Sequence, residues 1–207
     1  MDVGLFGGSF NPPHVAHQIV AETVREQFAL DAVWWMPAGT PPHKEAGAVA
    51  AAPHRLEMAR RATASNPAFE VRGEEVERDG PSYTIETLRV LEARHPEARF
   101  ALVIGGDSLA SFSEWRAPVQ IARRAELLVY GRPGDAGGPE ALLADLPEEV
   151  ARRVRFAEAP PLAVAGTDLR ERRRQGRSLR YLVPEAVRTY IHEHDLYAEE
   201  ARSAVAG

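Results

Sequence analysis

Residues 2–17 read DVGLFGGSFNPPHVAH, and this stretch decides the fold. Asp2 to Phe6 is a short apolar run that predicts a buried strand, and Gly7-Gly8 predicts a tight turn directly after it. Val15 to Phe28 then shows helical spacing of apolar residues, which predicts an amphipathic helix. The apolar residues on its predicted buried face are Val15, Ile19, Val20, Val24 and Phe28. The chain therefore begins with a strand, a glycine turn and a helix.

Two histidines stand at the start of this predicted helix. His14 and His17 are three residues apart, so they share one face of the first turn. A helix N-terminus attracts anions, and glycines let the backbone approach a ligand closely. The combination predicts a compact phosphate site. Each part also has a simpler interpretation: structural histidines, an ordinary loop, or a zinc-binding pair, although no third or fourth zinc ligand is obvious nearby.

The rest of the chain alternates between predicted strands and helices. Strands are expected at 2–6, 32–36, 69–71, 100–104, 127–130 and 154–156, with another around Val76. Helices are expected at 15–28, 53–65, 83–94 with Ser82 as N-cap, within 140–154, and at 167–175 and 184–194. This alternation predicts an α/β fold: a Rossmann-like doubly wound parallel sheet with helices on both faces and a helical C-terminal segment. We expect residues 1–207 to form a single domain whose helical C-terminal part spans about 167–197.

Ligands of such sheets bind outside the carboxyl ends of the strands, at the point where the winding reverses. Three segments of interest fall there: residues 7–17 after the first strand, the Gly105-Gly106-Asp107 turn after a central strand, and Thr167 after the last strand. The sequence contains no G-x-x-x-x-G-K-[ST], G-x-G-x-x-G or G-x-S-x-G motif. A P-loop, the dinucleotide fingerprint of dehydrogenases and a nucleophile elbow are therefore excluded.

Composition narrows the class of protein further. The chain has no cysteine, which excludes disulfides, thiolate zinc sites and a cysteine nucleophile and is consistent with a reducing cytosol. The net charge of -5 argues against broad attraction to nucleic acid, and the six arginines of residues 170–180 are explained by a solvated helix face. Neither a secretory signal nor an apolar run of roughly 20 residues is present. The sequence predicts a cytoplasmic protein without nucleic-acid or membrane partners.

The stretch GGSFNPPHVAH resembles the G-x-F-[DN]-P-x-H-x-[GA]-H motif of the nucleotidyltransferases related to class I aminoacyl-tRNA synthetases. More closely, the chain is similar to bacterial nicotinate-nucleotide adenylyltransferases over nearly its full length, from about residue 4 to residue 197. The similar segments are GLFGGSFNPPHVAH, WWMPAGTPPHK, SYTIETL, GGDSLASFSEW and YLVPEAVRTYIHEHDLY. The resemblance implies transfer of the adenylyl group of ATP to nicotinate mononucleotide in NAD biosynthesis, with release of pyrophosphate. Mg²⁺ would be held mainly by the ATP phosphates and water, with no metal ligands from the protein.

The resemblance also implies roles for individual residues. His14 and His17 would stabilise charge on the α-phosphate. Residues expected to bind ATP or its phosphates are Gly7, Gly8, Ser9, Phe10, Lys44, Gly105, Asp107, Thr167 and Arg170. Residues expected to bind the pyridine nucleotide are Tyr83, Thr84 and Trp115. The residues alone also allow a simpler interpretation of three of these positions. Lys44 could equally be a solvated lysine of a loop, Asp107 could be the N-cap of a helix, and Trp115 could be a core residue.

One motif departs from the family's pattern. The second phosphate motif of the family reads I-S-S-T-x-I-R, and here Ala165 and Gly166 replace its two serines while Thr167 and Arg170 are kept. A serine hydroxyl contributes roughly 1 kcal/mol as a hydrogen bond, and backbone N–H groups can still bind phosphate. We expect weaker or altered ATP binding, not loss of activity.

Two alternative functions remain open at this level. One is adenylyl or cytidylyl transfer to another phosphorylated acceptor, against which SYTIETL and Trp115 argue. The other is a nucleotide-binding protein without turnover, for which the two lost serines are the support. The helix start at Tyr83 and Thr84 favours an acidic acceptor over its amide. The sequence leaves open the acid-to-amide ratio, the choice between monomer and homo-oligomer, and the motion of the loop at 39–52.

Overall fold

The computed structural model describes residues 1–39, 49–78, 80–131 and 138–198. Within these ranges the strands form one six-stranded sheet in the order β3-β2-β1-β4-β5-β6, and all the pairings are parallel. The strands are β1 (Asp2–Gly8), β2 (Ala32–Pro37), β3 (Phe69–Val71), β4 (Arg99–Gly105), β5 (Ala125–Tyr130) and β6 (Val154–Ala157). The winding reverses between β1 and β4, so the ligand-binding edge is expected at their carboxyl ends.

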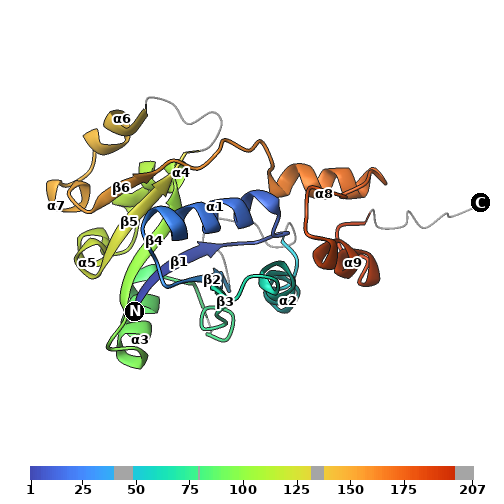
Figure 1. The fold of residues 1–207 in the computed structure, drawn as a ribbon, viewed down its shortest axis with the longest axis horizontal. Helices are drawn as coiled ribbons and strands as arrows, with labels where there is room; N and C mark the ends of the chain where they lie inside the picture. Colours follow the sequence, from blue (N-terminus) through green and yellow to red (C-terminus); the bar gives the residue numbers. More distant parts are fainter. Residues whose placement is uncertain (40–48, 79, 132–137, 199–207) are drawn as a thin grey trace, which may run out of the picture.

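Helices connect the strands and cover the sheet (Figure 1). The α-helices are α1 (Val15–Gln27), α2 (Ala52–Thr63), α3 (Thr84–Arg94), α4 (Gly106–Ala110), α5 (Pro118–Arg124), α6 (Gly138–Ala144), α7 (Glu148–Ala151), α8 (Gly166–Arg174) and α9 (Glu185–Glu193), and a 3-10 helix η1 spans Phe112–Glu114. No helix of the described ranges is both long and apolar enough to cross a membrane.

The core forms because alternate strand residues point to opposite faces of the sheet. Leu5 and Trp34 face one layer, where they pack with side chains of α3, α4 and α5. Phe6 and Trp35, their neighbours in the sequence, face the other layer and pack with α1. This arrangement confirms the predicted α/β doubly wound sheet with helices on both faces.

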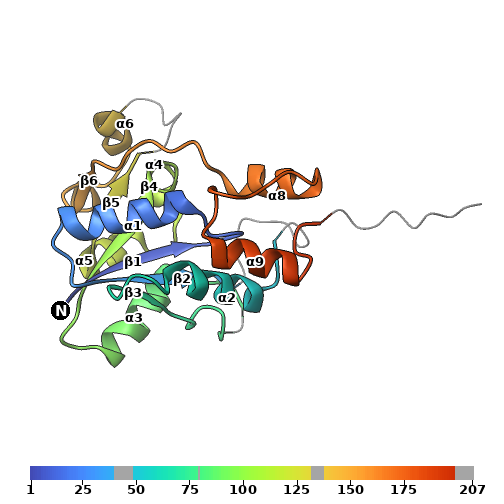
Figure 2. The same ribbon diagram turned by 45° about the vertical axis from the view of Figure 1, so that its right-hand side comes forward.

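The C-terminal helices form a third apolar cluster with α2. Met58 of α2, Leu169 of α8 and Val187 of α9 belong to it, and all three are buried. Figures 1 and 2 show α8 and α9 beyond the arrowhead of β1, with α9 beside α2. The C-terminal segment therefore lies at the edge of the sheet where a ligand is expected.

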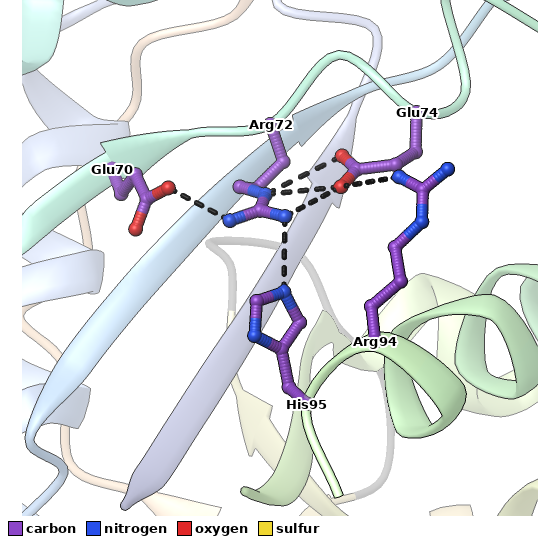
Figure 3. Close-up of polar contacts among 5 residues, drawn as sticks. All are labelled: Glu70, Arg72, Glu74, Arg94 and His95. Carbon is purple, nitrogen blue, oxygen red and sulfur yellow. Dashed lines mark hydrogen bonds and ion pairs between the residues drawn. The ribbon is translucent and has the colours of Figure 1, made fainter.

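An ion-pair network fixes the chain after β3 against the end of α3 (Figure 3). Arg72 lies at its centre and donates hydrogen bonds to Glu70 at 2.8 Å and to Glu74 at 2.6 Å. The ring nitrogen Nε2 of His95 accepts another hydrogen bond from Arg72 at 3.2 Å, and Arg94 lies 3.5 Å from Glu74. The network holds the start of the segment that leads from β3 to α3.

Several predicted boundaries differ from the structure. Gly7 and Gly8 belong to β1, because they pair with Met36 and Pro37, and the turn begins only at Ser9. The strand expected around Val76 is wrong: the Val76 N–H donates to the Gly73 carbonyl oxygen within a turn.

The predicted helix starts need correction as well. The N-cap of α3 is Tyr83, not Ser82, whose hydroxyl instead accepts a hydrogen bond from the Gly39 N–H at 3.2 Å. Gly105 is the N-cap of α4, so Gly105 to Asp107 is not a free turn and Asp107 is not an N-cap. The helix expected within 140–154 is two short helices, α6 and α7, because Pro147 interrupts the segment.

The buried face of α1 also consists of partly different residues from those predicted. Ile19 is 37% exposed, whereas Val20 and Val24 are buried together with Ala16 and Ala21. The alanines complete the face because they let α1 lie close to the sheet. The short helices α4 and α5 were not expected, since runs of five to seven residues carry little periodicity.

Candidate active site

A cavity of about 430 Å³ lies between the start of α1 and the start of α8, in the range typical of small-molecule sites. The β1–α1 turn contributes Ser9, Phe10, Asn11 and His14 to its lining, and the first turn of α1 contributes His17. On the opposite side it is lined by residues 162–168 and Arg170. The two predicted phosphate motifs, about 150 residues apart in the chain, therefore face the same cavity.

The two imidazoles are held together at the first turn of α1. His14 is the N-cap residue, and its backbone N–H donates to Nδ1 of His17 at 3.1 Å. The ring centroids lie 3.7 Å apart. Because Nδ1 of His17 accepts this bond, the proton of the neutral ring is on Nε2, which is then a donor. Both rings line the cavity, although His14 is only 6% exposed, so the two imidazoles meet at a helix start, where anions are attracted.

The other phosphate motif lies at the start of α8. Arg170 donates from Nη1 to the Asn11 carbonyl oxygen at 2.8 Å, and its Nη2 lies 3.4 Å from Oγ1 of Thr167. The Nε of Arg170 is buried, and no described residue accepts a hydrogen bond from it. Burial lowers the pKa of the Arg170 guanidinium, which nevertheless stays charged at neutral pH. A partly desolvated cation beside a helix N-terminus is a suitable partner for phosphate oxygens.

The two positions where the family motif has serine lie in different environments. Ala165 is the N-cap of α8, with extended backbone angles of φ -119 and ψ 140. Gly166 is the first residue of the helix, and a Cβ built there would lie 2.9 Å from the Asn11 carbonyl oxygen. That distance is too short for a carbon, and the oxygen belongs to the backbone of the site turn. The glycine therefore permits the close approach of α8 to the turn.

Restoring the serines one at a time should consequently have opposite effects. We expect Gly166→Ser to lower the free energy of unfolding by about 1–3 kcal/mol through overpacking and to raise the KM for ATP. We expect Ala165→Ser to raise stability by about 1 kcal/mol, since serine is a good N-cap. Thermal unfolding would measure the stability of the two variants, and the reaction rate at increasing ATP concentration would give their KM for ATP. Equal behaviour of the two variants would contradict the close packing of Gly166 on Asn11.

A second cavity, of about 590 Å³, lies on the other side of the β1 end. It is lined by Gly7 and Gly8, by Tyr83 and Thr84 at the start of α3, and by Trp115. A Cβ on Gly7 would meet nothing within 4 Å, so the backbone of β1 is open to a ligand there. Ser9 and Tyr130 line both cavities, so the two adjoin each other at the end of β1.

The structure thus separates the predicted residues into two groups. Gly105 and Asp107 line the second cavity with the residues predicted for the pyridine nucleotide, not the cavity of the histidines. The side chain of Phe10 is buried in the core against Trp35, with centroids 4.9 Å apart, so only its backbone is available to a ligand. Lys44 lies outside the described residues.

Trp115 is both a core and a cavity residue. It packs on Phe112 with a centroid distance of 5.0 Å, and its half-buried ring lines the second cavity. The Arg116 guanidinium lies 4.7 Å from the centroid of the neighbouring Tyr83 ring. The two interpretations weighed for Trp115 are therefore compatible.

Sequence reasoning missed four residues around the cavities: Asn11, Arg55, Glu75 and Tyr197. Arg55 is 1% exposed and donates to three backbone carbonyl groups. Its position on the apolar face of α2, four residues before Ala59, could have indicated from the sequence that Arg55 is buried. Burial raises the pKa of the Glu75 carboxyl group, which lines the second cavity and accepts a hydrogen bond from Thr87 at 2.8 Å. No sequence pattern distinguished Glu75 from its acidic neighbours.

The chain is similar to known proteins over most of its length. The family model described as "Cytidylyltransferase-like" matches residues 5–172. A relative from Salinibacter ruber, named as a probable nicotinate-nucleotide adenylyltransferase, is 57% identical over 95% of this chain and 98% of its own length. A relative from Exiguobacterium sibiricum with the same name is 43% identical over 96% of this chain and 100% of its own length.

Solved structures show the same fold. Nicotinic acid mononucleotide adenylyltransferase from Plasmodium falciparum, complexed with NaAD, has a TM-score of 0.77 at 16% identity and covers 95% of this chain and 97% of its own. A putative nicotinate-nucleotide adenylyltransferase from Vibrio parahaemolyticus has a TM-score of 0.69 at 17% identity, with 96% of each chain covered. The chain belongs to the cytidylyltransferase-like family and, within it, to the nicotinate-nucleotide adenylyltransferases.

Proposed function

We propose that this protein transfers the adenylyl group of ATP to nicotinate mononucleotide, giving nicotinate adenine dinucleotide and pyrophosphate, in NAD biosynthesis. The observation that carries the proposal is the pair of cavities that adjoin at Ser9 and Tyr130, at the switch point of the sheet. One contains the paired imidazoles and the second phosphate motif, and the other contains Trp115 and the start of α3. Two nucleotides can thus meet at the end of β1.

The chemistry follows from this placement. An oxygen of the mononucleotide phosphate attacks the α-phosphorus of ATP and forms the new P–O bond. The bond from that phosphorus to the oxygen bridging to the β-phosphate breaks, and pyrophosphate leaves. The nucleophile is already an anion, so positioning and charge stabilisation suffice. His14 and His17 contact the α-phosphate, to which Nε2 of His17 donates a hydrogen bond.

The triphosphate lies along the second motif in this proposal. Thr167, Arg170 and the N–H groups at the start of α8 bind the β- and γ-phosphates, and Lys44 adds a further cation. No cluster of three or more His, Asp or Glu side chains in the described ranges could hold a metal ion. A magnesium ion held by the phosphates and water fits these residues, and its charge would stabilise the leaving pyrophosphate. The chain itself holds and orients the phosphates.

The acceptor occupies the second cavity in this proposal. The pyridine ring stacks on Trp115, and the N–H groups at Tyr83 and Thr84 bind the nicotinate carboxylate. The open backbone at Gly7 lets the mononucleotide phosphate approach the turn. Gly105 and Asp107 bind ribose hydroxyl groups from the end of β4 and the first turn of α4.

Three broader expectations stay predictions. Residues 1–207 act as a single nucleotidyltransferase domain, and the packing of α8 and α9 on α2 supports this. The protein acts in the cytoplasm without nucleic-acid or membrane partners. Its assembly, as a monomer or a homo-oligomer, is to be measured by light scattering.

A pyrophosphate-release assay with a panel of acceptors tests the function. With ATP and Mg²⁺, we expect nicotinate mononucleotide to be a better acceptor than nicotinamide mononucleotide by about 10- to 100-fold in kcat/KM. Charge-assisted hydrogen bonds at the start of α3 account for a difference of that order. Phosphopantetheine serves as the acceptor for the rival transfer reaction. ATP binding without pyrophosphate release from any acceptor would favour the non-catalytic alternative.

A further inference from the structure

The C-terminal end of the described chain is bonded to the site turn. Tyr197 lies four residues beyond the end of α9, and its phenol donates a hydrogen bond to Oδ1 of Asn11 at 2.6 Å. Asn11 precedes His14 by three residues on the β1–α1 turn and is 4% exposed. The two residues are 186 positions apart in the sequence, so this contact exists only in the folded protein.

The backbone before the contact has an unusual conformation. Asp195 and Tyr197 have φ angles of 47 and 58, in the left-handed region that residues with a Cβ rarely adopt. The segment is held there because the Leu196 N–H donates to the Ile191 carbonyl oxygen at 2.9 Å and both residues join the cluster of α2, α8 and α9. This local turn directs the phenol of Tyr197 back towards Asn11.

Asn11 connects the site turn to three distant segments. Its Oδ1 also accepts a hydrogen bond from the Ala50 N–H at 3.0 Å, and its carbonyl oxygen accepts the bond from Arg170 at 2.8 Å. The hydrogen bonds of Asn11 thus link the turn that leads into His14 to the guanidinium group of Arg170 in the second phosphate motif. Displacement of Asn11 would move both.

We propose that Tyr197 is a positioning residue for adenylyl transfer: its hydroxyl group fixes Asn11, and Asn11 in turn fixes Arg170 and the turn that carries His14. Tyr197 acts on the ATP half of the site, because its contacts lead to the cavity of the histidines. The residues that line the acceptor cavity, such as Tyr83 and Trp115, lie on the other side of β1. This inference rests on the proposed function, because it concerns the geometry of that reaction.

The phenol keeps its donor role at neutral pH. Burial raises the pKa of Tyr197, and the nearby cations Arg170 and Arg55 offset this only in part. The hydroxyl group therefore stays protonated and can donate to the amide oxygen of Asn11. An amide oxygen cannot donate in return, so the direction of the bond is fixed.

The test removes the hydroxyl group alone. We expect Tyr197→Phe to lower kcat/KM for ATP about five- to tenfold, mainly through a higher KM for ATP, because one buried hydrogen bond is lost. The KM for nicotinate mononucleotide should stay within about twofold of the unmodified protein. The matched control is Tyr190→Phe, which removes a hydroxyl group of α9 that lies 3.0 Å from Nδ1 of His54. If Tyr197 had only a general structural role, Tyr197→Phe would change the KM for ATP and the KM for nicotinate mononucleotide alike, or Tyr190→Phe would change them as much as Tyr197→Phe does.

A double-mutant cycle tests whether Tyr197 acts through Asn11. In an Asn11→Ala background the hydroxyl group has no acceptor on the turn, so adding Tyr197→Phe should change neither KM nor kcat further. Additive effects would overturn the inference. If the Asn11→Ala protein does not fold, the comparison of Tyr197→Phe with Tyr190→Phe decides the question alone.

The failure of this inference is distinguishable from the failure of the proposed function. Absence of pyrophosphate release from the unmodified protein with every acceptor would overturn the function. An active unmodified protein whose Tyr197→Phe variant matches Tyr190→Phe in every kinetic constant would overturn only the positioning role.

Discussion

Replacement of His17 by alanine is expected to lower kcat for pyrophosphate release by about 10²- to 10³-fold, the usual effect of removing one preorganised donor from a transition state. The ring lines the cavity, and its Nδ1 is engaged by the His14 N–H, which leaves Nε2–H as the donor to a developing charge. His14→Ala should have an effect of similar order, because the two rings stack at 3.7 Å and act on the same phosphate.

The fold should survive these changes. His17→Ala removes one acceptor at the start of α1, which costs about 1 kcal/mol, and the core beneath α1 is made by other side chains. A matched control is His192→Ala, which removes an exposed imidazole in the last turn of α9. Stopped assays with ATP and nicotinate mononucleotide give kcat, and circular dichroism monitors folding. Full pyrophosphate release by both active-site variants would refute the roles given to the imidazoles.

The sheet could be predicted from the sequence because its strands are short, apolar and bounded by glycine or proline. Trp34 and Trp35 belong to the strand expected at 32–36, and they lie on opposite faces of β2. What could not be predicted was set by pairing and by tertiary contacts. Gly7 and Gly8 look like a turn but are extended because β2 pairs with them, and Ser82 looks like an N-cap but bonds to Gly39.

The site was predictable where local chemistry is concentrated. His14 and His17 sit at one helix start and could be recognised within a few residues, whereas Thr167 and Arg170, at another helix start, were indicated by the resemblance to the family motif. The contacts that hold these pairs in place could not be recognised in the same way. The bond from Tyr197 to Asn11 links residues that are distant in the chain, and nothing in the local pattern at either residue indicates it.

Arg55 is the residue whose loss should cost the most stability. Its Nε donates to the Ala50 carbonyl oxygen at 2.9 Å, its Nη1 to that of Ser9 at 3.1 Å and its Nη2 to that of Gly39 at 2.8 Å. Burial lowers the pKa of the guanidinium, yet it stays charged at neutral pH. One buried cation therefore connects the turn that borders both cavities to Gly39 and Ala50.

Arg55→Met should lower the free energy of unfolding by about 3–5 kcal/mol, since it leaves buried carbonyl groups without their charged donor. For a chain of this size that corresponds to a fall in Tm of roughly 6–20 °C. Arg55→Lys should recover only part of the loss, because one ammonium group cannot reproduce the planar fork that serves three acceptors.

The control for this prediction is Arg60→Met on the same helix. The side chain of Arg60 is 58% exposed and its ion pair with Glu57 spans 4.0 Å, so its removal should shift Tm by less than about 2 °C. Because Ser9 lines both cavities, Arg55→Met should also raise the KM of ATP and of nicotinate mononucleotide together. That pattern differs from the one expected for Tyr197→Phe, which affects ATP alone. A Tm for Arg55→Met as high as that of Arg60→Met would mean that the three carbonyl contacts do not stabilise the fold.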